Sequence, residues 1–181
     1  MSVLLLGLES NFGSAVIQRL LDEDDIVGVI EEDRARGEEW KKLGAHVALG
    51  SPADFDLIER AAQLARSIVI VESGLSDAGA VVEATLMGAR LVPGEQARII
   101  FVTAAPDPEI GETLTGSEFD FLILKIGTGK SLIRRSRPMP PEQVAEAINA
   151  ADDLAGSPRL EVDLGSNDGW SALGLEPPAQ T

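Results

Sequence analysis

The chain has 181 residues, which is long enough for one well-filled hydrophobic core and short for two. Its net charge of −15 repels nucleic acid and anionic membranes, and without cysteine it forms neither disulfides nor thiolate metal sites. No apolar run approaches the roughly 18–20 residues that cross a bilayer, and the start lacks the basic residues of an export signal. These features favour a cytoplasmic globular protein. Its acidity would give solubility or adaptation to a salty interior, or offer a surface to a basic partner.

Apolar, β-branched-rich runs recur along the chain, with stretches of helical spacing between them. Strands that are apolar throughout are covered on both faces, and alternation with helices makes a sheet parallel. The right-handed crossover rule then predicts an α/β fold, a three-layer, doubly wound, Rossmann-like parallel sheet of six to seven strands. The expected strands are Val3–Leu6, Ile26–Ile30, Val47–Leu49, Ile68–Val71, Ile99–Val102 and Phe121–Ile126.

Helices are expected between these strands because apolar residues recur there on one face. The run 15–21 is amphipathic, and Pro140–Glu142 opens the last helix, since proline is tolerated in a first turn. Ser51–Asp54 is typical of a turn into a helix, and Asp107–Pro108 is expected to break the chain after the fifth strand. The other helical faces are Leu57, Ile58, Ala61, Ala62 and Ala65; Val81, Val82, Thr85, Leu86 and Ala89; and Val144, Ala145, Ile148, Ala151 and Leu154.

The composition changes near residue 156, where Gly, Ser, Pro and Asn become frequent. We therefore expect one Rossmann-like domain over residues 1–155 and a C-terminal region over residues 156–181. Within that region Leu160–Leu164 alternates and is predicted to be an edge strand. The rest is expected to be loop-like, with Trp170 and Leu173 as anchors. Such an edge and tail would allow a homo-oligomer or a protein partner.

The most informative motif lies directly after the first strand. Gly7, Ser10 and Gly13 precede an amphipathic helix, in the arrangement of a dinucleotide-binding turn. Glycine lets the backbone approach a diphosphate, and the helix N-terminus offers free N–H groups. Ser10 replaces the middle glycine, and its hydroxyl could donate to a phosphate oxygen; Asn11 and Phe12 line the same turn. The alternative is a tight turn kept only for packing.

Glu31 ends the second strand, where an acid accepts hydrogen bonds from the adenosine ribose. Glu32 and Asp33 add negative charge that would repel a 2′-phosphate, so NAD is slightly favoured over NADP. Arg34 and Arg36 oppose this, since either could turn towards a phosphate. The alternative is a solvated acidic loop.

Further candidates follow the ends of other strands, where an open α/β sheet leaves its ligand crevice. Ser51 follows the third strand, Ser73 and Gly74 end the fourth, and Thr103 ends the fifth. Lys125 lies on the sixth strand, where it could contact the cofactor or pair with a carboxylate. The serines and Thr103 could equally be helix caps or turn residues.

Two other features are not expected to carry function. The stretch 127–131, Gly-Thr-Gly-Lys-Ser, follows a strand, but the phosphate-loop spacing needs a glycine where Leu124 stands. His46 is the only histidine, with no cysteine or second histidine to share a metal, so we expect no metal site.

Four segments have the form of a glycine turn, a third strand with its adenine-side turn, a fifth strand and a sixth strand: residues 3–16, 43–47 with 50–51, 99–103 and 119–125. Over residues 2–155 this ordered set resembles the atypical short-chain dehydrogenase/reductases of the NmrA-like, NAD(P)-binding kind. The resemblance implies a dinucleotide, NAD or NADP, as the small-molecule partner.

The resemblance does not extend to the family's catalytic residues. Reductases of that family use a tyrosine and a lysine four residues later to protonate a carbonyl oxygen, and this chain contains no tyrosine. The stretches 104–117 and 128–138 are also shorter than the family's catalytic and substrate segments. We therefore expect no catalytic residues of that kind, and a dinucleotide-binding protein with a sensing, regulatory or assembly role. Two alternatives stay open: an unusual NAD(P)-dependent oxidoreductase without a tyrosine acid, and a scaffold whose crevice takes no cofactor.

Overall fold

The computed structural model describes residues 2–105, 107–126 and 139–178. Seven parallel strands form one sheet in the order β3-β2-β1-β4-β5-β6-β7, which confirms the predicted doubly wound fold. The direction of chain progress reverses between β1 and β4, so the topological switch point lies there. The strands are β1 (Ser2–Leu6), β2 (Ile26–Glu31), β3 (His46–Leu49), β4 (Ala65–Val71), β5 (Arg98–Thr103), β6 (Phe121–Lys125) and β7 (Arg159–Asp163).

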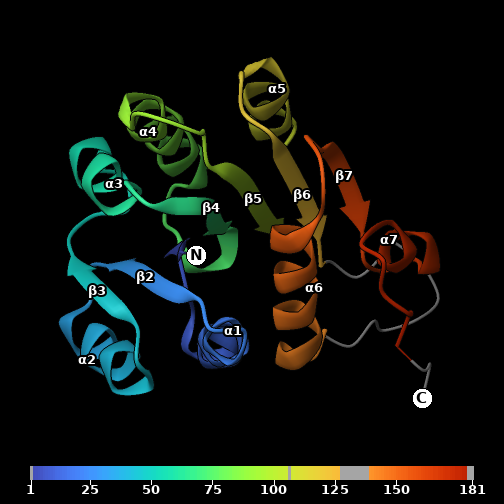
Figure 1. Ribbon diagram of the computed structural model, residues 1–181, viewed down its shortest axis with the longest axis horizontal. Helices are drawn as coiled ribbons and strands as arrows, with labels where there is room; N and C mark the ends of the chain where they lie inside the picture. Colours follow the sequence, from blue (N-terminus) through green and yellow to red (C-terminus); the bar gives the residue numbers. More distant parts are fainter. Residues whose placement is uncertain (1, 106, 127–138, 179–181) are drawn as a thin grey trace.

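Helices cover both faces of the sheet (Figure 1). α3, α4 and α5 lie on one face, whereas α1, α2 and α6 lie on the other, with α7 beside β7. None of the helices in the described ranges is long and apolar enough to span a bilayer. The helices are α1 (Ser10–Asp22), α2 (Arg34–Leu43), α3 (Phe55–Ala61), the short 3-10 helix η1 (Glu72–Gly74), α4 (Ala78–Leu91), α5 (Pro108–Gly116), α6 (Pro141–Asp153) and α7 (Asn167–Ala172).

The inner strands are buried on both faces because side chains alternate along each strand. In β1, Leu5 joins the apolar cluster beneath α1 and α6, whereas Leu4 joins the cluster beneath α3 and α4, and both are at most 1% exposed. Burying a side chain of this size contributes roughly 1.5–3 kcal/mol. The two clusters explain why these strands are apolar at almost every position.

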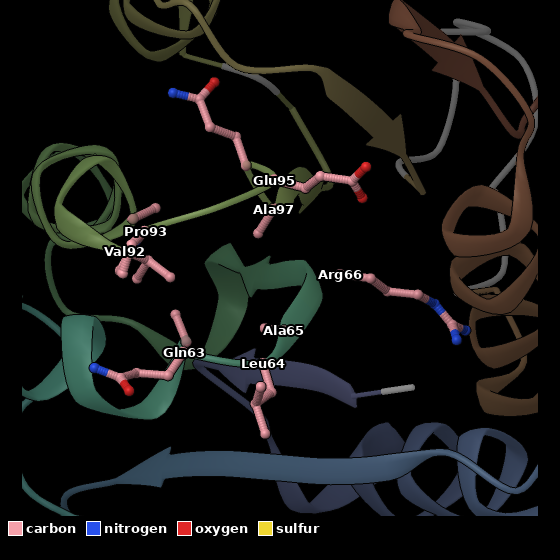
Figure 2. Close-up of a pocket in the computed structure, with 11 residues that line it drawn as sticks. Gln63, Leu64, Ala65, Arg66, Val92, Pro93, Glu95 and Ala97 are labelled. Atoms are coloured by element: carbon pink, nitrogen blue, oxygen red, sulfur yellow. The ribbon is translucent and has the colours of Figure 1, made fainter.

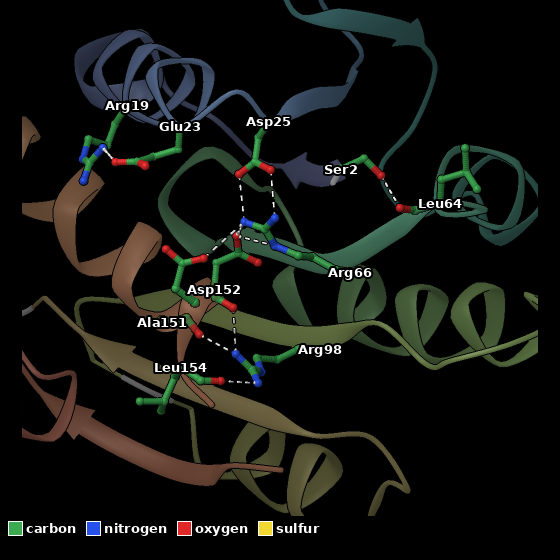
Figure 3. Close-up of polar contacts among 11 residues, drawn as sticks. Ser2, Arg19, Glu23, Asp25, Leu64, Arg66, Arg98, Ala151, Asp152 and Leu154 are labelled. Atoms are coloured by element: carbon green, nitrogen blue, oxygen red, sulfur yellow. Dashed lines mark hydrogen bonds and ion pairs between the residues drawn. The ribbon is translucent and has the colours of Figure 1, made fainter. Parts of the chain in front are cut away.

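A polar network lies at the amino-terminal ends of β4 and β5 (Figure 3). Arg66 donates two 2.8 Å hydrogen bonds to Asp25 and one of 2.8 Å to Asp152, and these partners are only 6% exposed. The hydrogen bond to Asp152 is the main cause that raises the pKa of Arg66 above its usual range. Arg98 donates to the backbone carbonyls of Ala151 and Leu154 at the end of α6. The network therefore ties α6 to two central strands.

The structure differs from the sequence-based expectation at the start of β4, at the start of α5 and in the C-terminal tail, among other places. Ala65 is the first residue of β4, because the preceding helix ends four residues earlier, at Ala61. The pair Asp107–Pro108 starts α5 instead of only breaking the chain, since the Asp107 side chain accepts from the Glu109 N–H and proline fits the first turn. The tail contains α7, where Trp170 donates a 2.8 Å hydrogen bond to the Leu164 carbonyl and is 4% exposed.

Candidate functional site

The residues singled out from the sequence follow the carboxyl ends of parallel strands, so they share one edge of the sheet. Leu6 pairs in register with Ile30 on one side and Ile70 on the other, which places the start of the glycine turn between the ends of β2 and β4. Thr103 pairs in register with Lys125. The structure therefore brings the candidates to the edge that carries the switch point.

The turn after β1 requires glycine at Gly7. Its φ is +71°, and a Cβ there would lie 2.3 Å from the Val71 carbonyl oxygen. A Cβ on Gly74 would lie 2.1 Å from the Gly7 carbonyl oxygen. The backbone after β4 thus packs directly on the turn, and both glycines serve this close approach.

Buried side chains hold the start of α1 in place. Gly13 lies against Trp40, since a Cβ on Gly13 would stand 2.8 Å from that ring. Phe12 is 9% exposed and belongs to the core cluster beneath α1. Ser10 and Asn11 begin the helix, but their side chains lie outside the described part of the structure. What the turn offers a ligand is the N-terminal backbone of α1, where first-turn N–H groups have no partner within the helix.

Glu31 ends β2, as predicted, and its carboxylate is 5% exposed. One oxygen accepts from the Asp33 N–H at 2.8 Å and from Arg36 Nη2 at 2.9 Å. The other accepts from Arg36 Nε at 3.1 Å and from Trp40 Nε1 at 3.3 Å. Asp33 also caps α2, because its side chain accepts from the Ala35 and Arg36 N–H groups. Glu31 is therefore the centre of a hydrogen-bonded cluster at the start of α2.

Arg36 supplies the positive charge of this cluster. Its hydrogen bonds to Glu31 raise its pKa above the ordinary value, and the charges of Asp33 and Glu9 act in the same direction. Glu9 is the N-cap residue of α1, although its side chain makes no capping hydrogen bond. A cation thus lies within electrostatic range of both the end of β2 and the start of α1.

A second pair lies at the ends of β4 and β5. The Thr103 hydroxyl donates to the carboxylate of Glu72 and accepts from the Ala105 N–H at 3.0 Å. Thr103 is 1% exposed, and Glu72 is half-buried. Because Glu72 immediately precedes Ser73 and Gly74, this carboxylate stands next to the segment that packs on the turn.

The remaining predicted residues lie at the rim. Ser51 is exposed, and its hydroxyl accepts from the Ala53 N–H at 3.2 Å, as in a turn. Ser73 and Gly74 were expected to end the fourth strand, but β4 ends at Val71 and both residues lie in the 3-10 helix η1, where Ser73 is exposed. Lys125 forms an ion pair with Glu161 of β7. The stretch 127–131 lies outside the described residues.

Sequence reasoning missed two side chains of this edge. Glu72 could have been noticed as an acid directly after five buried residues of β4. Trp40 gave no such signal, since its contacts with Gly13 and Glu31 depend on how α2 packs.

Pockets lie at both the amino-terminal and the carboxyl-terminal ends of the strands. One is lined by Gln63, Leu64, Ala65, Val92 and Pro93, near the starts of β4 and β5, opposite the glycine turn (Figure 2). Another lies between the starts of α4 and α5, where carboxylates of Glu72, Asp77 and Asp107 contribute to the wall. In the parts of the chain that are described, no group of three or more His, Cys, Asp or Glu side chains is arranged to hold a metal ion.

The fold and this edge define a Rossmann-type domain of the kind that binds NAD(P) at a glycine turn. Residues 3–124 match the TrkA-N domain family, and the chain belongs to that family. No curated protein sequence matches it.

Solved structures with the same fold include reductases and a dehydrogenase. ChuY, an anaerobillin reductase from Escherichia coli O157:H7, is 16% identical, with complete coverage of both chains (100% each) and a TM-score of 0.71. Triphenylmethane reductase from Citrobacter sp., complexed with NADP(H), is 11% identical over 90% of this chain and 69% of its own, with a TM-score of 0.68. Serine dehydrogenase from Escherichia coli is 16% identical over 89% of this chain and 96% of its own, with a TM-score of 0.57. At these identities the likeness establishes the shared fold.

Proposed function

We propose that this protein binds a nicotinamide dinucleotide at the Gly7 turn and acts in the cytoplasm by sensing or carrying it, in the manner of an atypical, NmrA-like short-chain dehydrogenase/reductase. The observation that carries the proposal is the strand–turn–helix unit at the switch point, with Gly7 at φ +71° and the N-terminus of α1 directly after it. Membership of the TrkA-N family supports the same ligand class.

The proposed role is regulatory because the chain lacks the usual proton donor. It contains no tyrosine, and among the described residues between β5 and β6 the one helix is α5, of nine residues. A partner that reads the dinucleotide-bound state, or a second copy of the chain, would complete such a role.

Ligand binding is tested by calorimetric titration and thermal unfolding of the purified chain with NAD⁺, NADH, NADP⁺ and NADPH. At 100 times its dissociation constant, the bound dinucleotide should add about 2.7 kcal/mol to the free energy of unfolding. For a chain of this size that corresponds to a rise in Tm of about 5–11 °C. If none of the four dinucleotides produces heat or a shift, the proposal fails and an assembly role without cofactor takes its place.

A second candidate is an NAD(P)-dependent oxidoreductase that needs no tyrosine, and the Glu72–Thr103 pair favours it. A hydroxyl hydrogen-bonded to a carboxylate is a proton-carrying arrangement, and it stands at the ends of the two strands beyond the switch point. Oxidation of NADH or NADPH with a panel of carbonyl compounds tests this candidate. Turnover that is lost in Glu72→Gln but kept in Glu83→Gln, an acid of the neighbouring helix, would support it.

A further inference from the structure

The carboxylate of Glu31 has its acceptor positions filled by the protein itself. A carboxylate offers about four lone-pair positions, and Glu31 receives four donors from Asp33, Arg36 and Trp40. A ribose hydroxyl that donated to Glu31 would have to displace one of them. Since Trp40 is 1% exposed, displacing it would leave a buried N–H without a partner. Glu31 is therefore poorly placed to act as the ribose acceptor that its position in the sequence predicts.

Arg36, in contrast, has N–H donors that Glu31 does not use. A guanidinium carries five N–H groups, and two of them are used on Glu31, which leaves three. The side chain is 39% exposed, so these groups are accessible. Trp40, which donates to the same carboxylate, packs against Gly13 of α1, so the cluster lies beside the helix that follows the glycine turn.

We propose that Arg36, held in place by Glu31, contacts the adenosine ribose and binds its 2′-phosphate, so that the protein prefers NADP(H) to NAD(H). This inference rests on the proposed dinucleotide binding. The Glu31–Arg36 pair is neutral as a unit, which cancels at close range the repulsion that a lone acid would exert on a phosphate. A guanidinium fixed on one side by a carboxylate presents its outer N–H groups in a rigid plane that suits phosphate oxygens. Glu31 then acts as a positioning residue.

The two roles of Glu31 predict opposite effects of the same substitution. If Glu31 were the ribose acceptor, Glu31→Gln would weaken NAD⁺ binding and strengthen NADP⁺ binding, since the repelling charge is gone. If Glu31 positions Arg36, Glu31→Gln frees the guanidinium and weakens NADP⁺ binding while NAD⁺ changes little.

The experiment titrates NADP⁺ and NAD⁺ into the full chain and follows the heat of binding, with Trp40 fluorescence in a Trp170→Phe background as a second readout. These are the two tryptophans of the chain, so the variant isolates the one that touches Glu31 and Gly13. The variants are Arg36→Gln, Arg36→Lys and Glu31→Gln. The matched control is Arg34→Gln, an exposed arginine two residues away on the same helix.

We expect the unsubstituted protein to bind NADP⁺ about tenfold more tightly than NAD⁺ or better, and Arg36→Gln to remove most of that difference. Arg36→Lys should keep part of it, and Arg34→Gln should leave the ratio within about threefold. Adenosine 2′,5′-bisphosphate should compete better than AMP, a comparison that needs no variant. NAD⁺ binding equal to or tighter than NADP⁺, or a ratio untouched by Arg36→Gln in a variant that folds, overturns the inference while dinucleotide binding stands. Binding of neither dinucleotide overturns the proposed function and this inference with it.

Discussion

Gly7→Ala is expected to destabilise the protein by about 2–5 kcal/mol and to abolish dinucleotide binding. The added Cβ would stand 2.3 Å from the Val71 carbonyl oxygen and within 2.8 Å of Leu75, in a residue whose φ is +71°. The left-handed conformation contributes about 1–2 kcal/mol of strain, and the forced contact about 1–3 kcal/mol. Because the obstructing oxygen belongs to the backbone of β4, a side-chain rotation cannot relieve the contact.

Urea unfolding of Gly7→Ala and of Gly74→Ala measures this loss of stability. The two substitutions add a Cβ to either side of the contact between the glycine turn and the segment after β4. The control is Gly111→Ala in α5, where an added Cβ meets nothing within 4 Å. That variant should be unchanged or more stable by about 0.5–1 kcal/mol. Equal stabilities for Gly7→Ala and Gly111→Ala would mean that the segment after β4 does not pack on the turn.

Arg66→Met is expected to lower the free energy of unfolding by about 3–5 kcal/mol. Methionine keeps much of the side-chain length but removes the cation from Asp152, whose side chain is fully buried, and from Asp25. A buried carboxylate that loses its cation keeps its desolvation penalty without the compensating attraction. The loss therefore far exceeds that of an exposed ion pair.

The control for the cost of an unpaired buried carboxylate is Arg90→Met. This substitution breaks the Arg90–Glu118 ion pair, in which both side chains are about half exposed. That variant should lose no more than about 1 kcal/mol in the same urea experiment. A double variant, Arg66→Met with Asp152→Asn, should recover part of the stability because one of the two carboxylates that lost their cation is then neutral. If Arg66→Met and Arg90→Met unfold at the same urea concentration, the network at the start of β4 is not a major source of stability.

Much of the fold could be read from local sequence. The apolar runs predicted β1 to β6, and alternation at Leu160–Leu164 predicted the seventh strand at the edge. Helix boundaries were less accurate. Ala65 continues the spacing of a helical face, but pairing with Ser2 of β1 draws it into β4. Asp107 and Pro108 are equally suited to a turn and to a helix start, and the following residues decided for α5.

The places of several candidate residues at strand ends could be predicted from the sequence, but the partners of their side chains could not. Glu31, Thr103 and Lys125 are the last residues of β2, β5 and β6, and strand ends can be located from sequence. Their partners could not be chosen, since 30 acidic and 15 basic side chains offer many pairings. Thr103 and Glu72 lie 31 positions apart, and they meet only because β4 and β5 are adjacent in the sheet.

The sequence by itself determined a parallel sheet between helices, with a glycine turn after its first strand, because side-chain periodicity and glycine geometry act over a few neighbouring residues. Only the tertiary structure decided that the Glu31 carboxylate accepts hydrogen bonds from Arg36 and Trp40, and that Arg66 donates hydrogen bonds to Asp25 and Asp152. A hydrogen bond selects its partner by distance and direction in space. Those quantities exist only after the strands have paired and the helices have packed.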